Sequence, residues 1–437
     1  MLAAGHPSQT ADKPAEAPSP VQLAEAPEKI YSDNPDDSWN RIFYYLFSRR
    51  VTAHLTADFP EGAPFREVDG LLQALHLQMS TRTFERNETG DRAIDPLYPS
   101  FLVDDGIRVV LRNPAYERFR KALEGGLRDT AARSPMARGM MQNDLWSAYD
   151  IVFRYQHYEQ QGQYELAQRR LEVLDLLGQM MRKVALTPEE IRGLPNNYSA
   201  AKTKRPLPDL FGKDSGWVEV QWFPQRMHDA SADYRRVTRV FLKPARAPQD
   251  MQKFLNDFRG ENNGPIGRLE GVALVIQPLV IDMRGELVAT NVTTDVQFRM
   301  FEKTSEGAFQ RTRIGVFEVS RKRLLSQQES GGMTEVEENE GMYLSAAGND
   351  YTFASPHCGN GGPPTALVVR PRTRCSFCHG GNDVTRVMTF GIAIPPKEGM
   401  GPPVRQLDRA KHEAAGFVMS KKMGREDWKS LGKHFQK

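Results

Sequence analysis

Cysteine is nearly absent from this chain. Only three of its 437 residues are cysteines, too few for the framework of several disulfides that stabilises many small secreted domains. All three lie between Cys358 and Cys378, so the rest of the chain has no thiol. This clustering indicates that a local site, rather than general packing, requires these residues.

Long apolar runs and an excess of one charge are missing as well. No stretch approaches the roughly 18 apolar residues of a membrane-spanning helix, and we predict no transmembrane segment. Lys and Arg number 58 and Asp and Glu 55, a balance that predicts no nucleic-acid partner. The sequence also has no Walker loop, no HExxH and no G-x-S-x-G motif.

The first 36 residues are rich in Ala, Pro and Glu. They offer little apolar surface to bury, which predicts a disordered tether over residues 1–36. No apolar core of a signal peptide is visible there. Leu2-Ala3-Ala4-Gly5 has the small-residue character of the end of an export signal, so we expect a signal that has been removed.

The remaining pattern predicts an α+β protein. Residues 37–203 show mainly helical periodicity, with helix starts at Ser134-Pro135 and Thr187. Leu171, Leu174 and later apolar residues repeat at the spacing of a buried helix face. Residues 204–395 alternate as strands do and predict a β-rich, antiparallel domain. Residues 396–437 predict a Pro/Gly linker followed by a basic C-terminal helix.

The strongest motif is the pentapeptide CSFCH, in which Cys375 and Cys378 precede His379. Random placement of three Cys and nine His would produce a CxxCH in only roughly 3 × 10⁻⁴ of such chains. Two thiols three positions apart can reach the two vinyl groups on one edge of a porphyrin, with the adjacent His beneath the iron. The spacing therefore predicts a covalently attached haem.

These five residues resemble the haem-attachment motif of the monohaem c-type cytochromes; the resemblance does not extend to the rest of the chain. It implies one haem c per chain, His379 as the proximal iron ligand, and assembly outside the cytoplasm. We therefore expect a periplasmic or secreted protein. Small class I cytochromes place the motif just after a helix, whereas here it follows an extended, proline-containing stretch. We expect a haem-binding loop on the β-rich domain.

Zinc is the alternative cofactor. Cys358, Cys375 and Cys378 with a His could supply four ligands to a structural zinc ion. This alternative gives Cys358 a role that the haem hypothesis does not provide.

Further haem contacts are predicted close to the motif. Arg372 and Arg374 suit the haem propionates, because the guanidinium group pairs well with carboxylates. His357 or Met388 is the candidate distal ligand of the iron.

One-electron transfer with a redox partner protein is the function that these features favour. The first alternative is a haem enzyme or small-ligand sensor with an open iron. The second is a zinc-stabilised binding or scaffold protein. Sequence alone leaves the redox partner, any substrate and the oligomeric state open.

Overall fold

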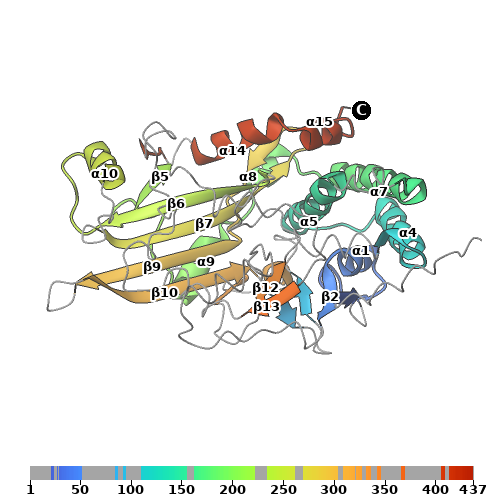
Figure 1. Cartoon of the computed structure of the whole chain (residues 1–437), viewed down its shortest axis with the longest axis horizontal. Helices are drawn as coiled ribbons and strands as arrows, with labels where there is room; N and C mark the ends of the chain where they lie inside the picture. The colour runs from blue at the N-terminus through green and yellow to red at the C-terminus, as the bar shows by residue number, and fades with distance from the viewer. Residues whose placement is uncertain are drawn as a thin grey trace, which may run out of the picture.

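The fold is taken from a computed structural model of the whole chain (Figure 1). The structure describes the following residues: 21–23, 27, 29–51, 84–86, 92–94, 110–154, 162–221, 234–260, 269–303, 309–319, 321–326, 331–335, 342–345, 366–369, 405–408 and 413–436.

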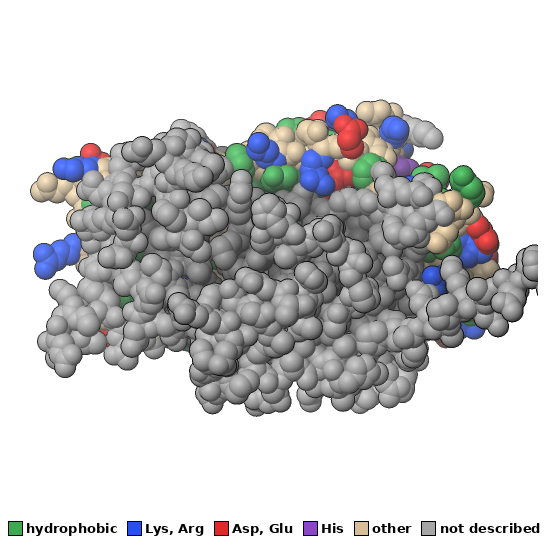
Figure 2. All heavy atoms as spheres, in the orientation of Figure 1, with side chains coloured by type: hydrophobic (Ala, Val, Ile, Leu, Met, Phe, Trp, Pro, Cys, Tyr) green, Lys and Arg blue, Asp and Glu red, His purple; other side chains and the backbone are tan. Residues whose placement is uncertain are grey.

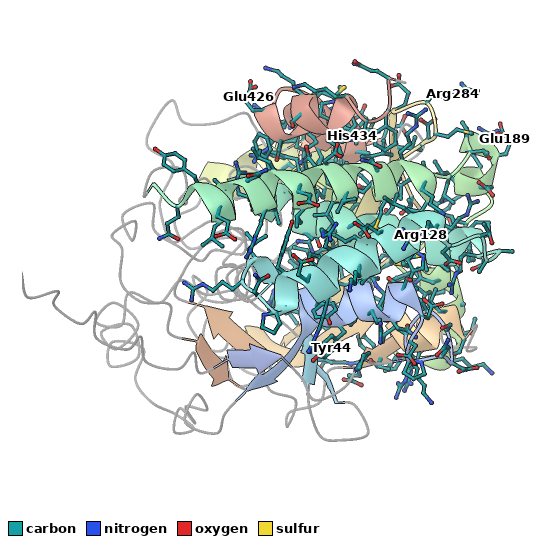
Figure 3. All side chains as sticks on the ribbon, turned by 90° about the vertical axis from the view of Figure 1, so that its right-hand side faces the viewer. Tyr44, Arg128, Glu189, Arg284, Glu426 and His434 are labelled. Atoms are coloured by element: carbon teal, nitrogen blue, oxygen red, sulfur yellow. The ribbon has the colours of Figure 1, made fainter. Side chains whose placement is uncertain are left out.

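The N-terminal half is built around a layer of helices. The helices described there are α1 (Ser38–Phe47), α4 (Ala115–Arg128), α5 (Pro135–Arg154), α7 (Tyr164–Lys183), α8 (Pro188–Arg192) and α9 (Asn197–Lys204). Helix α5 packs along α7, and α4 packs against both α1 and α7. Viewed from the side, this layer runs from α1 through α4 to α7, with the C-terminal helices beyond α7 (Figure 3).

Two of the predicted helix starts are confirmed, and each has a local physical cause. Helix α5 begins at Pro135, and the Ser134 hydroxyl accepts the backbone N–H of Ala137 at 3.2 Å. Helix α8 begins after Thr187, whose hydroxyl accepts the Glu190 N–H while the Glu190 carboxylate accepts the Thr187 N–H. Both side chains satisfy N–H groups that a helix start leaves without partners.

An antiparallel eight-stranded sheet follows. Its strand order is β11-β10-β9-β7-β6-β5-β14, with β8 paired to β7. The strands are β5 (Val218–Gln221), β6 (Arg236–Pro244), β7 (Leu269–Ile281), β8 (Leu287–Ala289), β9 (Asp295–Lys303), β10 (Phe309–Val319), β11 (Met333–Glu335) and β14 (Arg405–Gln406). Helix α10 (Met251–Gly260) joins β6 to the stretch before β7, and α11 (Arg321–Leu325) follows β10. The predicted mixed α+β class is confirmed at this level.

The central strands are buried on both faces. Every described residue of β7 except Glu270 is buried, so its side chains do not alternate between core and solvent. One apolar cluster joins the sheet to the helices: Val237 and Leu279 pack with Leu177 and with Leu431 near the chain end. The helices and the sheet therefore share a core.

The described residues of the N-terminal 36 contact the rest of the chain. Strand β1 (Val21–Leu23) pairs with β2 (Ser48–Val51) in a small four-stranded sheet that also contains β3 (Phe84–Arg86) and β4 (Arg92–Ile94). Ile30 is buried and Tyr31 packs against the helical core. The reason is that Ile30 and Tyr31 are apolar and their backbone N–H groups donate to the Asn40 side chain.

The C-terminal helix prediction is confirmed as two helices, α14 (Glu413–Met423) and α15 (Glu426–Gly432). They lie along the edge of the molecule near α5, α7 and β6 (Figure 1). Side chains of both charges gather on this edge in the space-filling view (Figure 2). None of the helices within the described ranges is long and apolar enough to cross a membrane.

Candidate functional site

The CSFCH motif lies in sequence between two described strands. Strand β13 (Ala366–Val369) pairs with β12 (Met342–Ser345), and β14 pairs with β5 at one edge of the large sheet. Both β12 and β13 lie within residues 204–395, where the sequence pattern predicts strands. The residues predicted to hold a cofactor or metal all lie outside the described residues: Cys358, Cys375, Cys378, His379, Arg372, Arg374, His357 and Met388.

Two further methionines near the chain end lie within α14. Met419 packs against the helical core, whereas Met423 is 49% exposed. Met419 therefore acts as core filling on this helix.

The main polar feature of the described residues is a buried ion cluster around Lys422. We use "Lys422 cluster" for Lys422, Asp150, Asp427 and Arg235. The Lys422 Nζ lies 2.8 Å from the Asp150 Oδ2 and 3.1 Å from the Asp427 Oδ2. The Arg235 Nε lies 3.1 Å from the same Asp150 oxygen. All four side chains are at most 1% exposed.

Aromatic residues surround this cluster. The Lys422 Nζ lies 5.2 Å from the centre of the Trp146 ring, and the Trp146 and Trp428 rings are 6.1 Å apart. The Tyr149 hydroxyl donates to Ser430 at 3.0 Å. Burial raises the pKa of Tyr149 to about 12. The C-terminal helices are therefore held on α5 by ions enclosed in aromatic packing.

A second buried group lies one to two turns earlier on α5. Tyr31 donates its hydroxyl to Asp144, and the Arg321 Nη2 lies 2.5 Å from the other Asp144 oxygen. Burial first, and then the negative charge of Asp144, raise the pKa of Tyr31 well above its ordinary value. The group joins the N-terminal segment, α5 and α11.

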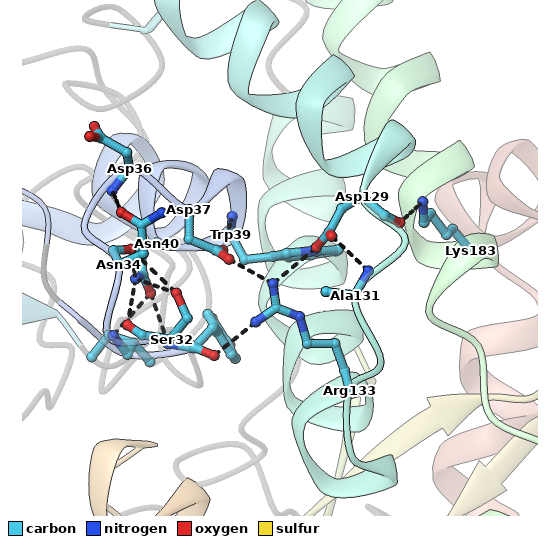
Figure 4. Close-up of polar contacts among 12 residues, drawn as sticks. Ser32, Asn34, Asp36, Asp37, Trp39, Asn40, Asp129, Ala131, Arg133 and Lys183 are labelled. Atoms are coloured by element: carbon cyan, nitrogen blue, oxygen red, sulfur yellow. Dashed lines mark hydrogen bonds and ion pairs between the residues drawn. The ribbon is translucent and has the colours of Figure 1, made fainter.

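Arg133 links the N-terminal segment to the residues around Asp37 and Asp129 (Figure 4). Its guanidinium donates to the Tyr31 carbonyl at 2.9 Å, to Asp37 at 2.7 Å and to Asp129 at 2.9 Å. Asp37 also accepts the Trp39 N–H at the start of α1. One arginine thus fixes the N-terminal segment, α1 and the end of α4.

The Lys422 cluster and the group of Tyr31, Asp144 and Arg321 have the chemistry of structural contacts that hold segments of the chain together. Each carboxylate lies beside a Lys or Arg, so its charge is compensated. Across the described residues, no group of three His, Cys, Asp or Glu side chains could hold a metal ion. The chemistry predicted from the sequence therefore still depends on the CSFCH segment.

Sequence reasoning did not identify the Lys422 cluster. A signal was present in α5, where Asp144 and Asp150 flank the apolar Leu145, Trp146 and Tyr149. Charged residues inside such an aromatic-rich helix can mark a buried polar contact. The partner Lys422 lies 272 positions away in the chain, so no local pattern could pair it with Asp150.

Comparison with known proteins identified no relative of this chain. No known protein family, no curated protein and no solved structure matches the chain.

Proposed function

We propose that this protein carries one haem c, attached through Cys375 and Cys378 with His379 as proximal ligand, and transfers single electrons outside the cytoplasm. The observation that carries the proposal is the CSFCH motif in a chain with only three cysteines. The donor chemistry fits the group: two thiols for the porphyrin edge and one imidazole for the iron. When bound, a haem supplies reversible one-electron chemistry at its iron.

The chain's own residues would hold and orient the group. The thioether links from Cys375 and Cys378 would retain it without deep burial, and Arg372 and Arg374 would pair with its propionates. The motif lies between β13 and β14 in sequence, and each of these strands pairs with another strand. Pairing at both ends supports the hypothesis of a haem-binding loop carried by strands.

Zinc remains the competing hypothesis because it uses Cys358 as well. The two hypotheses differ in what Cys358→Ser does. Under the haem hypothesis this thiol has no role in attachment, so haem content stays unchanged. Under the zinc hypothesis one of four ligands is lost, and the metal leaves.

The experiment measures haem and zinc per chain in the native protein, in Cys358→Ser and in Cys378→Ser. We expect a haem absorption that survives denaturation and acid–acetone extraction, because thioether bonds keep the pigment on the chain. Cys358→Ser should match the native protein, and Cys378→Ser should show impaired attachment. A colourless native protein with one zinc per chain, lost in Cys358→Ser, would overturn the proposal.

A further inference from the structure

One face of the large sheet is apolar and closed to solvent. Residues that pair across antiparallel strands share a face of the sheet. The registers place Val240 beside Val220 and Leu274, and Leu242 beside Val272. We use "outer face" for a set of side chains on β5, β6 and β7 that are each at most 3% exposed: Val220, Val240, Leu242, Val272, Leu274 and Ile276.

The described helices do not account for the burial of the outer face. On the opposite face, Phe241 and Val275 pack with Tyr198 of α9. Leu279, near the end of β7, packs with Leu177 of α7. None of the apolar clusters found among the described residues contains an outer-face side chain. A cover for this face must therefore come from another part of the chain.

The ends of residues 370–404 are attached on opposite sides of the sheet. This stretch follows β13 and leads directly into β14, which pairs with β5. Strands β12 and β13 lie at the level of β10, well below β5, in Figure 1, and they stay on the lower side in Figure 3. The strand order places β9, β7 and β6 between β10 and β5. A connection from β13 to β14 therefore has to cross the sheet.

The crossing has one face open to it. The opposite face is occupied by α9 and the residues around it, whereas no described element packs its apolar side chains on the outer face. The path from β10 to β5 covers four strand spacings of about 4.8 Å each, well within the reach of this stretch. Length and attachment points therefore favour the outer face as its path.

The sequence of the stretch suits that path. Phe390, Ile392 and Ile394 alternate with the small residues Gly391 and Ala393. Alternation of this kind is typical of an extended segment with one apolar side. Such a segment can bury its apolar side on a sheet that already presents valine and leucine.

We infer that the outer face is the docking site of residues 370–404, with Phe390, Ile392 and Ile394 against the leucines of β6 and β7. The CSFCH segment then lies on the large sheet rather than on the C-terminal helices. The docking itself does not depend on the cofactor. That the sheet thereby carries a haem rests on the proposed function.

The test uses the full-length protein with leucine replaced by photo-leucine, a diazirine analogue of similar size. On illumination it bonds to atoms in contact with it, within about 4 Å. Cross-linked peptides are then identified by mass spectrometry. Residues 370–404 contain no leucine, so every photo-leucine link to them comes from another part of the chain.

Leu242 and Leu274 should form links to peptides from residues 370–404. Leu279 is the matched control, because it lies on the same strand as Leu274 but packs with the helices. It should link to peptides of α7 or α5 and lose the links to residues 370–404.

Links from Leu242 and Leu274 to other segments alone overturn the inference. Absence of any link from these two leucines, while Leu279 forms its own, overturns it as well. The outcome is separate from that of the cofactor experiment. A colourless protein with the expected links retains the docking and loses the haem, whereas a haem protein without them retains the haem and loses the docking.

Discussion

Lys422 and Asp150 form an ion pair in which neither side chain is exposed to solvent. The Nζ of Lys422 lies 2.8 Å from the Oδ2 of Asp150, and both side chains have 0% exposure. The pair joins the C-terminal helix α14 to the central helix α5. The cost of taking both charges out of water offsets much of the attraction between them. Removing one partner leaves the other charge buried and uncompensated, which destabilises the protein by more than the intact pair stabilises it.

We predict that Lys422→Met lowers the free energy of unfolding by about 3–5 kcal/mol, because it leaves Asp150 and Asp427 buried with one fewer cation. Chemical denaturation measures this change. Lys429→Met is the control: Lys429 is 58% exposed and pairs with a surface glutamate, so its loss should cost at most about 1 kcal/mol. Equal effects of the two substitutions would contradict the buried position of Lys422.

The second prediction concerns alkaline pH and Tyr149. Burial raises the pKa of Tyr149 to about 12, whereas an unfolded chain gives its hydroxyl a pKa near 10. As pH rises above about 10, the unfolded state loses this proton while the folded state keeps it. The free energy of unfolding therefore falls with pH in this window, by up to about 2–3 kcal/mol for this residue.

Tyr149→Phe should make that fall less steep. The free energy of unfolding of the variant and the wild type is compared between about pH 9 and pH 11 by denaturant titration. Tyr164→Phe serves as the control for loss of a surface hydroxyl, since Tyr164 is 78% exposed. If Tyr149→Phe follows the wild-type slope, burial does not hold the proton on Tyr149.

The sequence predicts those parts of the fold that depend on residues close to one another along the chain. The helix starts at Pro135 and Pro188 depend on Ser134 and Thr187, which lie next to the helices they begin. The pattern that predicts strands within residues 204–395 is also local, and β6 lies in that range. Both signals act within a few residues, and both predictions are confirmed.

Long-range packing is what the pattern misses. Leu171 has the spacing of a buried residue on α7 but is 56% exposed, because that side of the helix has no neighbour among the described elements that covers it. Conversely, Asp150 lies on a helix buried on nearly all sides, and its partners are Arg235, just before β6, and Lys422 of α14. Helical periodicity cannot say which distant elements cover a face.

The third prediction identifies the distal ligand under the haem proposal. If His357 or Met388 binds the iron, then replacing that residue with Ala should let the reduced protein bind carbon monoxide, which the wild type should not do. Met419→Ala is the control, since Met419 packs in the helical core and should change stability alone. The ultraviolet–visible spectrum reports each case. Immediate carbon monoxide binding by the wild type would instead support the open-iron enzyme or sensor.

The last prediction compares two helical glycines that have opposite surroundings. A Cβ at Gly178 of α7 would lie 2.4 Å from the His434 Cδ2, whereas a Cβ at Gly416 of α14 has no atom within 4 Å. Replacing a helical Gly with Ala favours the helix by up to about 1 kcal/mol at either position.

Gly416→Ala should therefore stabilise the protein. Gly178→Ala should destabilise it by about 1–3 kcal/mol, because the new methyl group must displace His434, whose backbone carbonyl also accepts a bond from Arg182 at 3.0 Å. Adding His434→Ala to Gly178→Ala should restore the helix gain, which a double-mutant cycle on thermal unfolding can measure. If Gly178→Ala alone stabilises the protein as Gly416→Ala does, then the His434 ring moves aside freely. The close packing of the C-terminal segment on α7 would then contribute little to stability.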